Sequence, residues 1–146
     1  MKTIYPFERV DNLRLGLSMS EVAAWSDQPA RIREITDPVA RTIYEYPEKS
    51  LTCYFDDSSG EWRLFLIVVS RSSDVVMLLN TDVFRSDIQA FIVKHGFSTR
   101  RNNHFECLCV TVIELGMDFM VNHDGNLEAI HVHDRGSWER RNRRQE

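Results

Sequence analysis

The feature that most constrains this chain is a pattern of elements that occurs twice along its 146 residues. In each half, a short segment with helical spacing of apolar residues precedes short segments in which apolar residues alternate. An offset of 65 or 66 residues aligns Ser20 with Ser86 and Gly60 with Gly125. The repeat predicts two similar halves, about residues 10–70 and 76–134, that share the core of a single domain covering residues 1–134. Because identities between the halves are few, an accidental match of two common units is the alternative.

Each half is predicted to begin with a helix. Residues 18–21 fit the capping box S-x-x-E, in which the serine and glutamate side chains satisfy free N–H groups of the first turn. Pro29 follows and ends this helix. In the second half, residues 86–89 form a second possible cap, and Gly96 is a natural C-terminal stop.

Three strands are predicted to follow each helix. They cover residues 41–46, 51–55 and 62–69 in the first half, and residues 105–114, 117–121 and 127–133 in the second. Turns rich in Asp, Asn, Ser and Gly precede the last strand of each half, and residues 100–103 are predicted to be a polar loop. The expected fold class is α+β, with a largely antiparallel sheet made from two helix-plus-meander halves and with the helices packed on one face.

Alternation assigns side chains to the two faces of the sheet. Cys53, Phe55, Phe119 and Val121 are expected in the core. The opposite face is expected to carry Tyr44, Tyr54, Asp118, Met120, His131 and His133. Aromatic and methionine side chains adapt well to partners, so this face is a predicted binding surface. The alternative is that the other half of the chain, or a second copy in a homodimer, covers it.

Charge is unevenly distributed. The whole chain has a net charge of -4, but residues 135–146 contain five Arg and two Glu, so the rest of the chain is more acidic than the total suggests. We predict that residues 135–146 form a basic, disordered tail, with contact to RNA or to an acidic partner as the alternative. Asp56, Asp57 and Glu61 lie around one turn, which is either solvated or meets a basic partner surface. The acidic total argues against nucleic-acid binding.

Residues with catalytic or metal-binding chemistry do not form a recognised set. His131 and His133, with His123 nearby, resemble part of a zinc site, but the spacing fixes no third ligand. The chain has three cysteines, and an odd number at these spacings does not indicate a disulfide framework. No P-loop, nucleophile elbow or H-E-x-x-H motif occurs. We therefore expect a non-enzymatic protein without metal or cofactor, and an enzyme that uses the three histidines is the alternative.

The sequence also indicates a location. No charged-then-apolar leader opens the chain, and its longest apolar runs are far shorter than the roughly 20 residues of a membrane helix. We expect a cytoplasmic protein that does not contact a membrane.

The segment from Leu13 to Val22, LRLGLSMSEV, resembles the x-L-G-M-S-x-x-E-V opening of many small bacterial proteins. In those proteins a helix, a proline-containing loop and a hairpin follow, often twice in tandem, and here Pro29 and the hairpin around residues 56–60 follow in that order. The layout is similar to β-lactamase-inhibitory-protein-like modules and to immunity proteins of bacterial polymorphic-toxin systems (Rhs, contact-dependent and type VI secretion).

This resemblance implies a stoichiometric inhibitor that binds a cognate protein toxin, such as a basic, nuclease-like domain. The predicted partner-binding residues are Tyr44, Tyr54, Asp56, Asp57, Glu61, Asp118, Met120, His131 and His133. The alternative is an adaptor or homodimeric module that binds some other protein.

Overall fold

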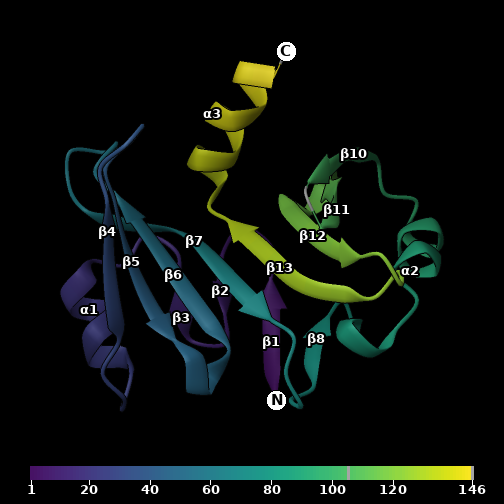
Figure 1. The fold of residues 1–146 in the computed structure, drawn as a ribbon, viewed down its shortest axis with the longest axis horizontal. Helices are drawn as coiled ribbons and strands as arrows, with labels where there is room; N and C mark the ends of the chain where they lie inside the picture. Colours follow the sequence, from purple (N-terminus) through teal and green to yellow (C-terminus); the bar gives the residue numbers. More distant parts are fainter. Residues whose placement is uncertain (105, 146) are drawn as a thin grey trace.

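The computed structural model describes residues 1–104 and 106–145, and within them the chain forms three α-helices and two β-sheets (Figure 1). The helices are α1 (Met19–Trp25), α2 (Ile88–His95) and α3 (Arg135–Gln145). The larger sheet contains β4 (Arg31–Ile35), β5 (Arg41–Tyr46), β6 (Leu51–Asp56), β7 (Arg63–Ser70), β10 (Thr99–His104), β11 (Cys107–Val112), β12 (Met117–Asn122) and β13 (Leu127–His133). The smaller sheet contains β1 (Lys2–Tyr5), β2 (Arg9–Val10), β3 (Leu13–Arg14), β8 (Val76–Leu78) and β9 (Thr81–Asp82). The predicted α+β class is confirmed.

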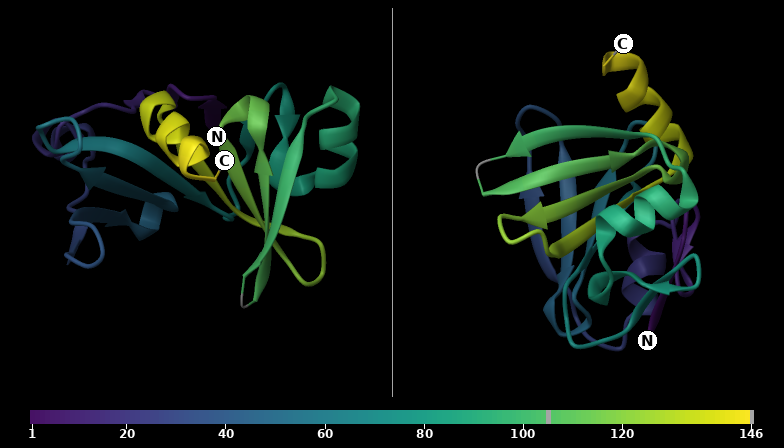
Figure 2. Two further views of the ribbon diagram at one scale, coloured as in Figure 1. Left: turned by 90° about the horizontal axis from the view of Figure 1, so that it is seen from above. Right: turned by 90° about the vertical axis from the view of Figure 1, so that its right-hand side faces the viewer.

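The larger sheet consists of two halves with the same order of elements. α1 is followed by β4 to β7, and α2 is followed by β10 to β13. The last strands of the two halves, β7 and β13, pair antiparallel in the middle of the sheet, with Ile67 opposite Val132. The strand order is β10-β11-β12-β13-β7-β6-β5-β4. In each half, therefore, the first strand lies at an edge of the sheet and the last strand lies at its centre. From this central pair, the strands of the two halves diverge (Figures 1 and 2).

Each half has four strands rather than the predicted three. The additional strands, β4 and β10, form the two edges of the sheet. All five residues of β4 are exposed, and the residues 100–103 that we expected in a loop pair with β11. An edge strand is held by main-chain hydrogen bonds on one side and needs no buried face. Apolar alternation was therefore the wrong signal for these two strands.

The helix caps agree only in part with the predictions. The capping box of α1 is confirmed, because Ser18 Oγ accepts a hydrogen bond from Glu21 N (3.2 Å) and Glu21 Oε1 accepts one from Ser18 N (3.0 Å). The N-cap of α2 is Asp87 rather than Ser86, since Asp87 Oδ1 accepts from Ala90 N at 3.0 Å. Gly96 ends α2 at φ +69, a left-handed conformation that suits glycine.

One hydrophobic core lies between the larger sheet, the smaller sheet and the first two helices. α1 contributes Val22, and α2 contributes Phe91 and Ile92 to this core. The four expected core residues, Cys53, Phe55, Phe119 and Val121, are all buried there. No helix in the described part of the chain is both long and apolar enough to cross a membrane.

Tyr44 does not lie on the face where we expected it. It pairs with Cys53 across β5 and β6 and therefore shares the core face. Its ring centroid is 4.8 Å from that of Phe55. The neighbouring Ile43, opposite Tyr54, occupies the other face instead. The prediction failed because alternation separates the residues of a strand into two sets without saying which set faces inward.

Residues 135–145 form α3, where we expected a disordered tail. Asp134 Oδ1 accepts a hydrogen bond from Ser137 N at 2.6 Å, as an N-cap residue does. Trp138 is only 4% exposed, and its ring contacts the rings of Phe7 and His133. The helix extends from the end of β13, between the two halves of the larger sheet (Figure 1). One cap and one buried aromatic residue therefore order a segment whose composition resembles a disordered tail.

Candidate functional site

We call the face of the larger sheet opposite α1 and α2 the open face. Cross-strand pairs place the candidate residues on it: Tyr54 lies opposite Leu66, Asp118 opposite His131, and His131 opposite Val68. His133 and Met120 belong to the same face by alternation along β13 and β12. Five of the nine predicted partner-binding residues thus share this face: Tyr54, Asp118, Met120, His131 and His133.

A cleft of about 440 Å³ lies on the open face beside the first turns of α3. Four predicted residues line it: Asp56, Asp118, His131 and His133. Residues that we had not predicted complete the lining, namely Val39, Arg41, Ser58, Phe65, Leu66, Ser137, Arg140 and Arg141. The predicted residues Asp57 and Glu61 are not among those that line the cleft, and Glu61 pairs with Arg63 instead.

A larger cleft of about 540 Å³ lies beside α2, lined in part by Gln89, Asn122 and His123. Among the described residues that line it, Asp87 is the only one with a charged side chain, and it already caps α2. The smaller cleft on the open face has five charged residues as well as two histidines. We therefore regard the smaller cleft as the candidate site.

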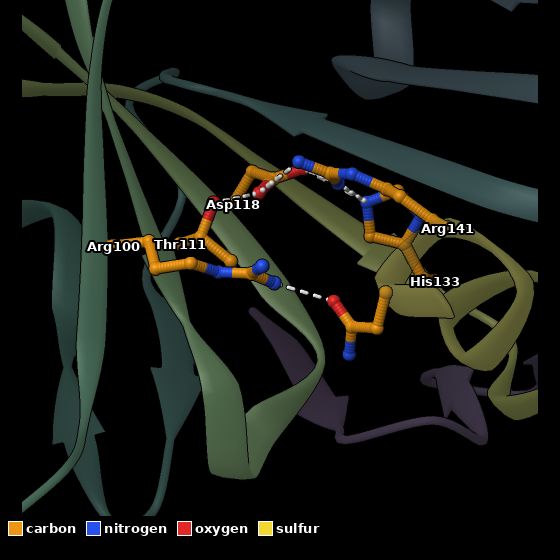
Figure 3. A network of polar contacts seen from close by, with 6 residues as sticks. Arg100, Thr111, Asp118, His133 and Arg141 are labelled. Atoms are coloured by element: carbon orange, nitrogen blue, oxygen red, sulfur yellow. Dashed lines mark hydrogen bonds and ion pairs between the residues drawn. The ribbon is translucent and has the colours of Figure 1, made fainter. Parts of the chain in front are cut away.

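Asp118 is the centre of a buried polar network at one wall of the cleft (Figure 3). Its side chain is 5% exposed. Oδ1 accepts a hydrogen bond from Thr111 Oγ1 at 2.7 Å, and Oδ2 lies 2.9 Å from His133 Nε2. The guanidinium of Arg141 contacts both carboxylate oxygens, which is the bidentate geometry that favours arginine over lysine.

These partners determine the charge of Asp118. Burial by itself would raise its pKa, but hydrogen bonds from His133, Arg141 and Thr111 outweigh burial and hold the pKa well below its usual value. The neighbouring Cys109 shows the opposite effect. Burial, together with the negative charge of Asp118, raises the pKa of this thiol to about 11. Asp118 is therefore a carboxylate near neutral pH, and Cys109 is a thiol.

A second contact ties α3 to the sheet on the same side. Arg100, on the edge strand β10, donates a hydrogen bond from Nη2 to Asn142 Oδ1 (Figure 3). The Nε atom of Arg100 is buried and has no hydrogen-bond partner in the described part of the chain. Together, Arg141 and Asn142 attach the second half of α3 to strands on the open face.

The floor of the cleft is apolar on the side of the first half. Phe65, Leu66 and Val68 form a small hydrophobic cluster that is separate from the main core, and Tyr54 and Ala129 pack against it. The guanidinium of Arg41 lies 5.4 Å from the centroid of the Phe65 ring, a cation–π distance. The site thus combines an apolar floor with arginine side chains.

The three histidines that could have formed an enzyme site do not come together. His123 lies in the turn before β13, whereas His133 is the last residue of β13, so the two are separated by the length of that strand, roughly 20 Å at about 3.3 Å per residue. Within the described residues, no group of three or more His, Cys, Asp or Glu side chains could hold a metal ion.

Sequence reasoning missed the contribution of α3, because we treated its arginines as a tail. Two signals could have identified it: Asp134, three residues before Ser137, is a possible N-cap, and Trp138 is an unusual residue for a disordered segment. No protein-family model matches the sequence, and no curated protein or solved structure is significantly similar to the chain.

Proposed function

We propose that this chain is an immunity protein, which binds a cognate protein toxin through the open face and neutralises it stoichiometrically. One observation carries the proposal. Both α1 and α2 and the smaller sheet pack on one face of an eight-stranded sheet, while the other face presents a cleft with an apolar floor and several arginines.

The chemistry of this face favours a protein as the partner. Arginine and aromatic residues are enriched in the centres of protein interfaces, and Phe65, Arg41 and Arg140 line the cleft. Apolar side chains are also exposed nearby: Val39, which lines the cleft, is 49% exposed, and Ile35 on the edge strand is 37% exposed. Arg41 and Phe65 lie on paired strands, which hold these two side chains on a rigid framework, so that ordering them on binding costs little.

Inhibition of this kind requires no chemistry from the chain itself. The titratable residues at the wall of the cleft bind one another, since Asp118 is shared between His133 and Arg141. That arrangement favours a structural role for the network, in which it fixes α3 beside the cleft. The toxin would be inactivated because its active site or substrate path is covered.

The experiment that tests the proposal is co-expression of this chain with the product of the neighbouring gene, in a host that this product kills. We expect the chain to restore growth and to co-purify with the toxic domain at a fixed ratio. A toxic domain from an unrelated system serves as the control, and growth should not be restored there. If the chain neither restores growth nor co-purifies with its neighbour, the proposal is wrong.

A homodimeric module is the alternative use of the same face. Sedimentation of the free chain tests this alternative. If the wild type is a dimer and Val39→Glu is a monomer, a second copy covers the cleft. A monomer is the result that the immunity proposal requires for the free protein.

A further inference from the structure

We infer that the cleft on the open face binds an acidic peptide segment of the partner, with Arg41 and Arg140 pairing with its carboxylates and Phe65 and Val39 contacting its apolar side chains. This inference rests on the proposed function, which it deepens by naming the chemistry of the partner. It also differs from the expectation that the acidic residues 56, 57 and 61 meet a basic partner.

Two arginines of the cleft, Arg41 and Arg140, form no ion pair within the described residues, although the charge of Asp134 acts on Arg140. Arg41 and Arg140 are both exposed, and neither forms an ion pair with any side chain in residues 1–103 or 106–142. Arg41 lies near the Phe65 ring, and Arg140 donates a hydrogen bond to the hydroxyl of Ser58 at 3.2 Å. Both guanidiniums therefore retain donors for an anionic ligand.

The carboxylates around the cleft are already engaged elsewhere. Asp118 binds Arg141 on both oxygens. Asp56 accepts a hydrogen bond from the Ser58 hydroxyl at 2.9 Å. Asp134, whose charge acts on Arg140, caps α3 through Ser137 N. None of these three carboxylates forms an ion pair with Arg41 or Arg140, so a carboxylate from a partner would complement the two guanidiniums.

Helix geometry separates the roles of the two adjacent arginines of α3. Successive residues of a helix point about 100° apart, because a turn contains 3.6 residues. Arg141 therefore reaches Asp118 on β12, while Arg140 reaches Ser58 in the turn between β6 and β7. Arg141 anchors the helix, and Arg140 is left at the cleft for a ligand.

The same observations favour a peptide over a nucleic acid. The floor residues Phe65 and Leu66 are only 6% and 8% exposed, so their rings and methyl groups offer a shallow apolar contact rather than an open platform for stacking bases. The net charge of -4 of the chain would also repel a nucleic acid at long range, because a nucleic acid is a polyanion. A short acidic segment carries fewer charges than a nucleic acid, so the net charge opposes its approach less, and its apolar residues can use the shallow floor.

Titration of purified chain into fluorescein-labelled peptides, followed by anisotropy at low salt, tests the inference. The probes are a peptide of alternating Glu and Leu, the same peptide with Lys in place of Glu, and a single-stranded oligonucleotide of similar length. We expect saturable binding of the Glu peptide alone. Arg41→Gln and Arg140→Gln should each weaken it about fivefold, the effect of losing one exposed ion pair of about 1 kcal/mol. The matched control is Arg101→Gln. Arg101 is exposed and follows Arg100 on β10, so it points to the opposite face of that strand, and its substitution should leave the affinity for the Glu peptide unchanged.

Amide chemical shifts measured during the same titration locate the bound peptide. We expect the largest changes at Phe65, Leu66 and Ser137, which line the cleft. Because Arg140 lies on α3, its substitution can loosen that helix, whereas Arg41 lies on β5 and its substitution reports on the cleft independently. Tight binding of the oligonucleotide, shifts confined to another surface, or equal affinity of the Arg41 and Arg101 variants would each overturn the inference.

The outcome is distinguishable from failure of the proposed function. If the Glu peptide binds as expected but co-expression restores no growth, the immunity proposal falls and the ligand class of the cleft stands. If growth is restored equally well by an Arg41→Gln and Arg140→Gln double variant that no longer binds the peptide, the inference falls and the immunity proposal stands.

Discussion

At the scale of single residues, Asp118 connects the parts of the molecule that form the cleft. Its carboxylate joins β11 through Thr111, β13 through His133 and α3 through Arg141. Compared with an apolar group of similar size, a buried and fully hydrogen-bonded carboxylate adds little to the stability of the fold. Removing one member of such a network is costly, because it leaves the charges of the remaining members buried without a partner. The consequence is that truncation of Asp118 should cost much more than truncation of an exposed acid.

We expect Asp118→Ala to lower the free energy of unfolding by about 3 kcal/mol, because Arg141 and His133 then lose their partner in a buried site. Urea denaturation at pH 7 measures this. Asp57→Ala, at an exposed position in the turn after β6, should change the free energy by less than about 0.5 kcal/mol. Equal effects of the two substitutions would contradict the role that we assign to the network.

The lowered pKa of Asp118 predicts a dependence of stability on pH. A carboxyl group whose pKa is lower in the folded than in the unfolded protein stabilises the fold above its unfolded value of about 3.9. This stabilisation is lost as the pH falls through the lower, folded value. The free energy of unfolding should therefore fall between pH 5 and pH 2 by less in Asp118→Asn than in the wild type, as urea titrations over that range would show. Parallel curves would contradict the pKa shift.

At the scale of elements, α3 depends on its contacts with the rest of the protein. A helix of 11 residues is marginal on its own in water, and α3 has few apolar residues. Trp138 packs against Phe7 and His133, while Arg141 binds Asp118. The helix should therefore detach when the tryptophan anchor is removed.

We expect Trp138→Ala to make trypsin remove the end of the chain at Arg140 and Arg141 first, since these bonds become accessible once α3 detaches. Mass spectrometry of the early products measures this. Glu139→Ala, at the adjacent exposed position, should leave the cleavage rate within about twofold of the wild type, because a surface substitution of this kind is nearly neutral. If Trp138→Ala leads instead to simultaneous cleavage throughout the chain, α3 is an integral part of the fold rather than a docked element.

The elements that the sequence predicts correctly are those whose structure is determined by residues close together in the chain. The capping box at Ser18 and the apolar strands β6, β7 and β12 follow from patterns within a few residues. The edge strand β4 and the helix α3 depend on partners distant in sequence, so neither alternation nor composition reveals them. The inward orientation of Tyr44 likewise follows from its pairing with Cys53 rather than from its own neighbours.

At the scale of the whole molecule, the central β7–β13 pair joins two similar halves into one sheet. The candidate site lies on this sheet beside α3, so it combines residues from β5, β6, β7, β12, β13 and α3. Alternation could predict Asp118, His131 and His133 on one face. It could not predict the cleft or the place of Arg140 in it, because both depend on how the C-terminal helix returns to the sheet.

The measurement that tests the central claim most directly is the dissociation constant of the purified complex with the cognate toxic domain, determined by calorimetry for two matched variants. Val39 lines the cleft and is 49% exposed, whereas Val93 lies on α2 and is 77% exposed. We expect Val39→Glu to weaken binding at least about tenfold, since a charge would be buried against the partner, and Val93→Glu to leave it within about twofold. Unchanged binding by Val39→Glu, or loss of binding by Val93→Glu, would contradict the claim that the toxin binds the open face.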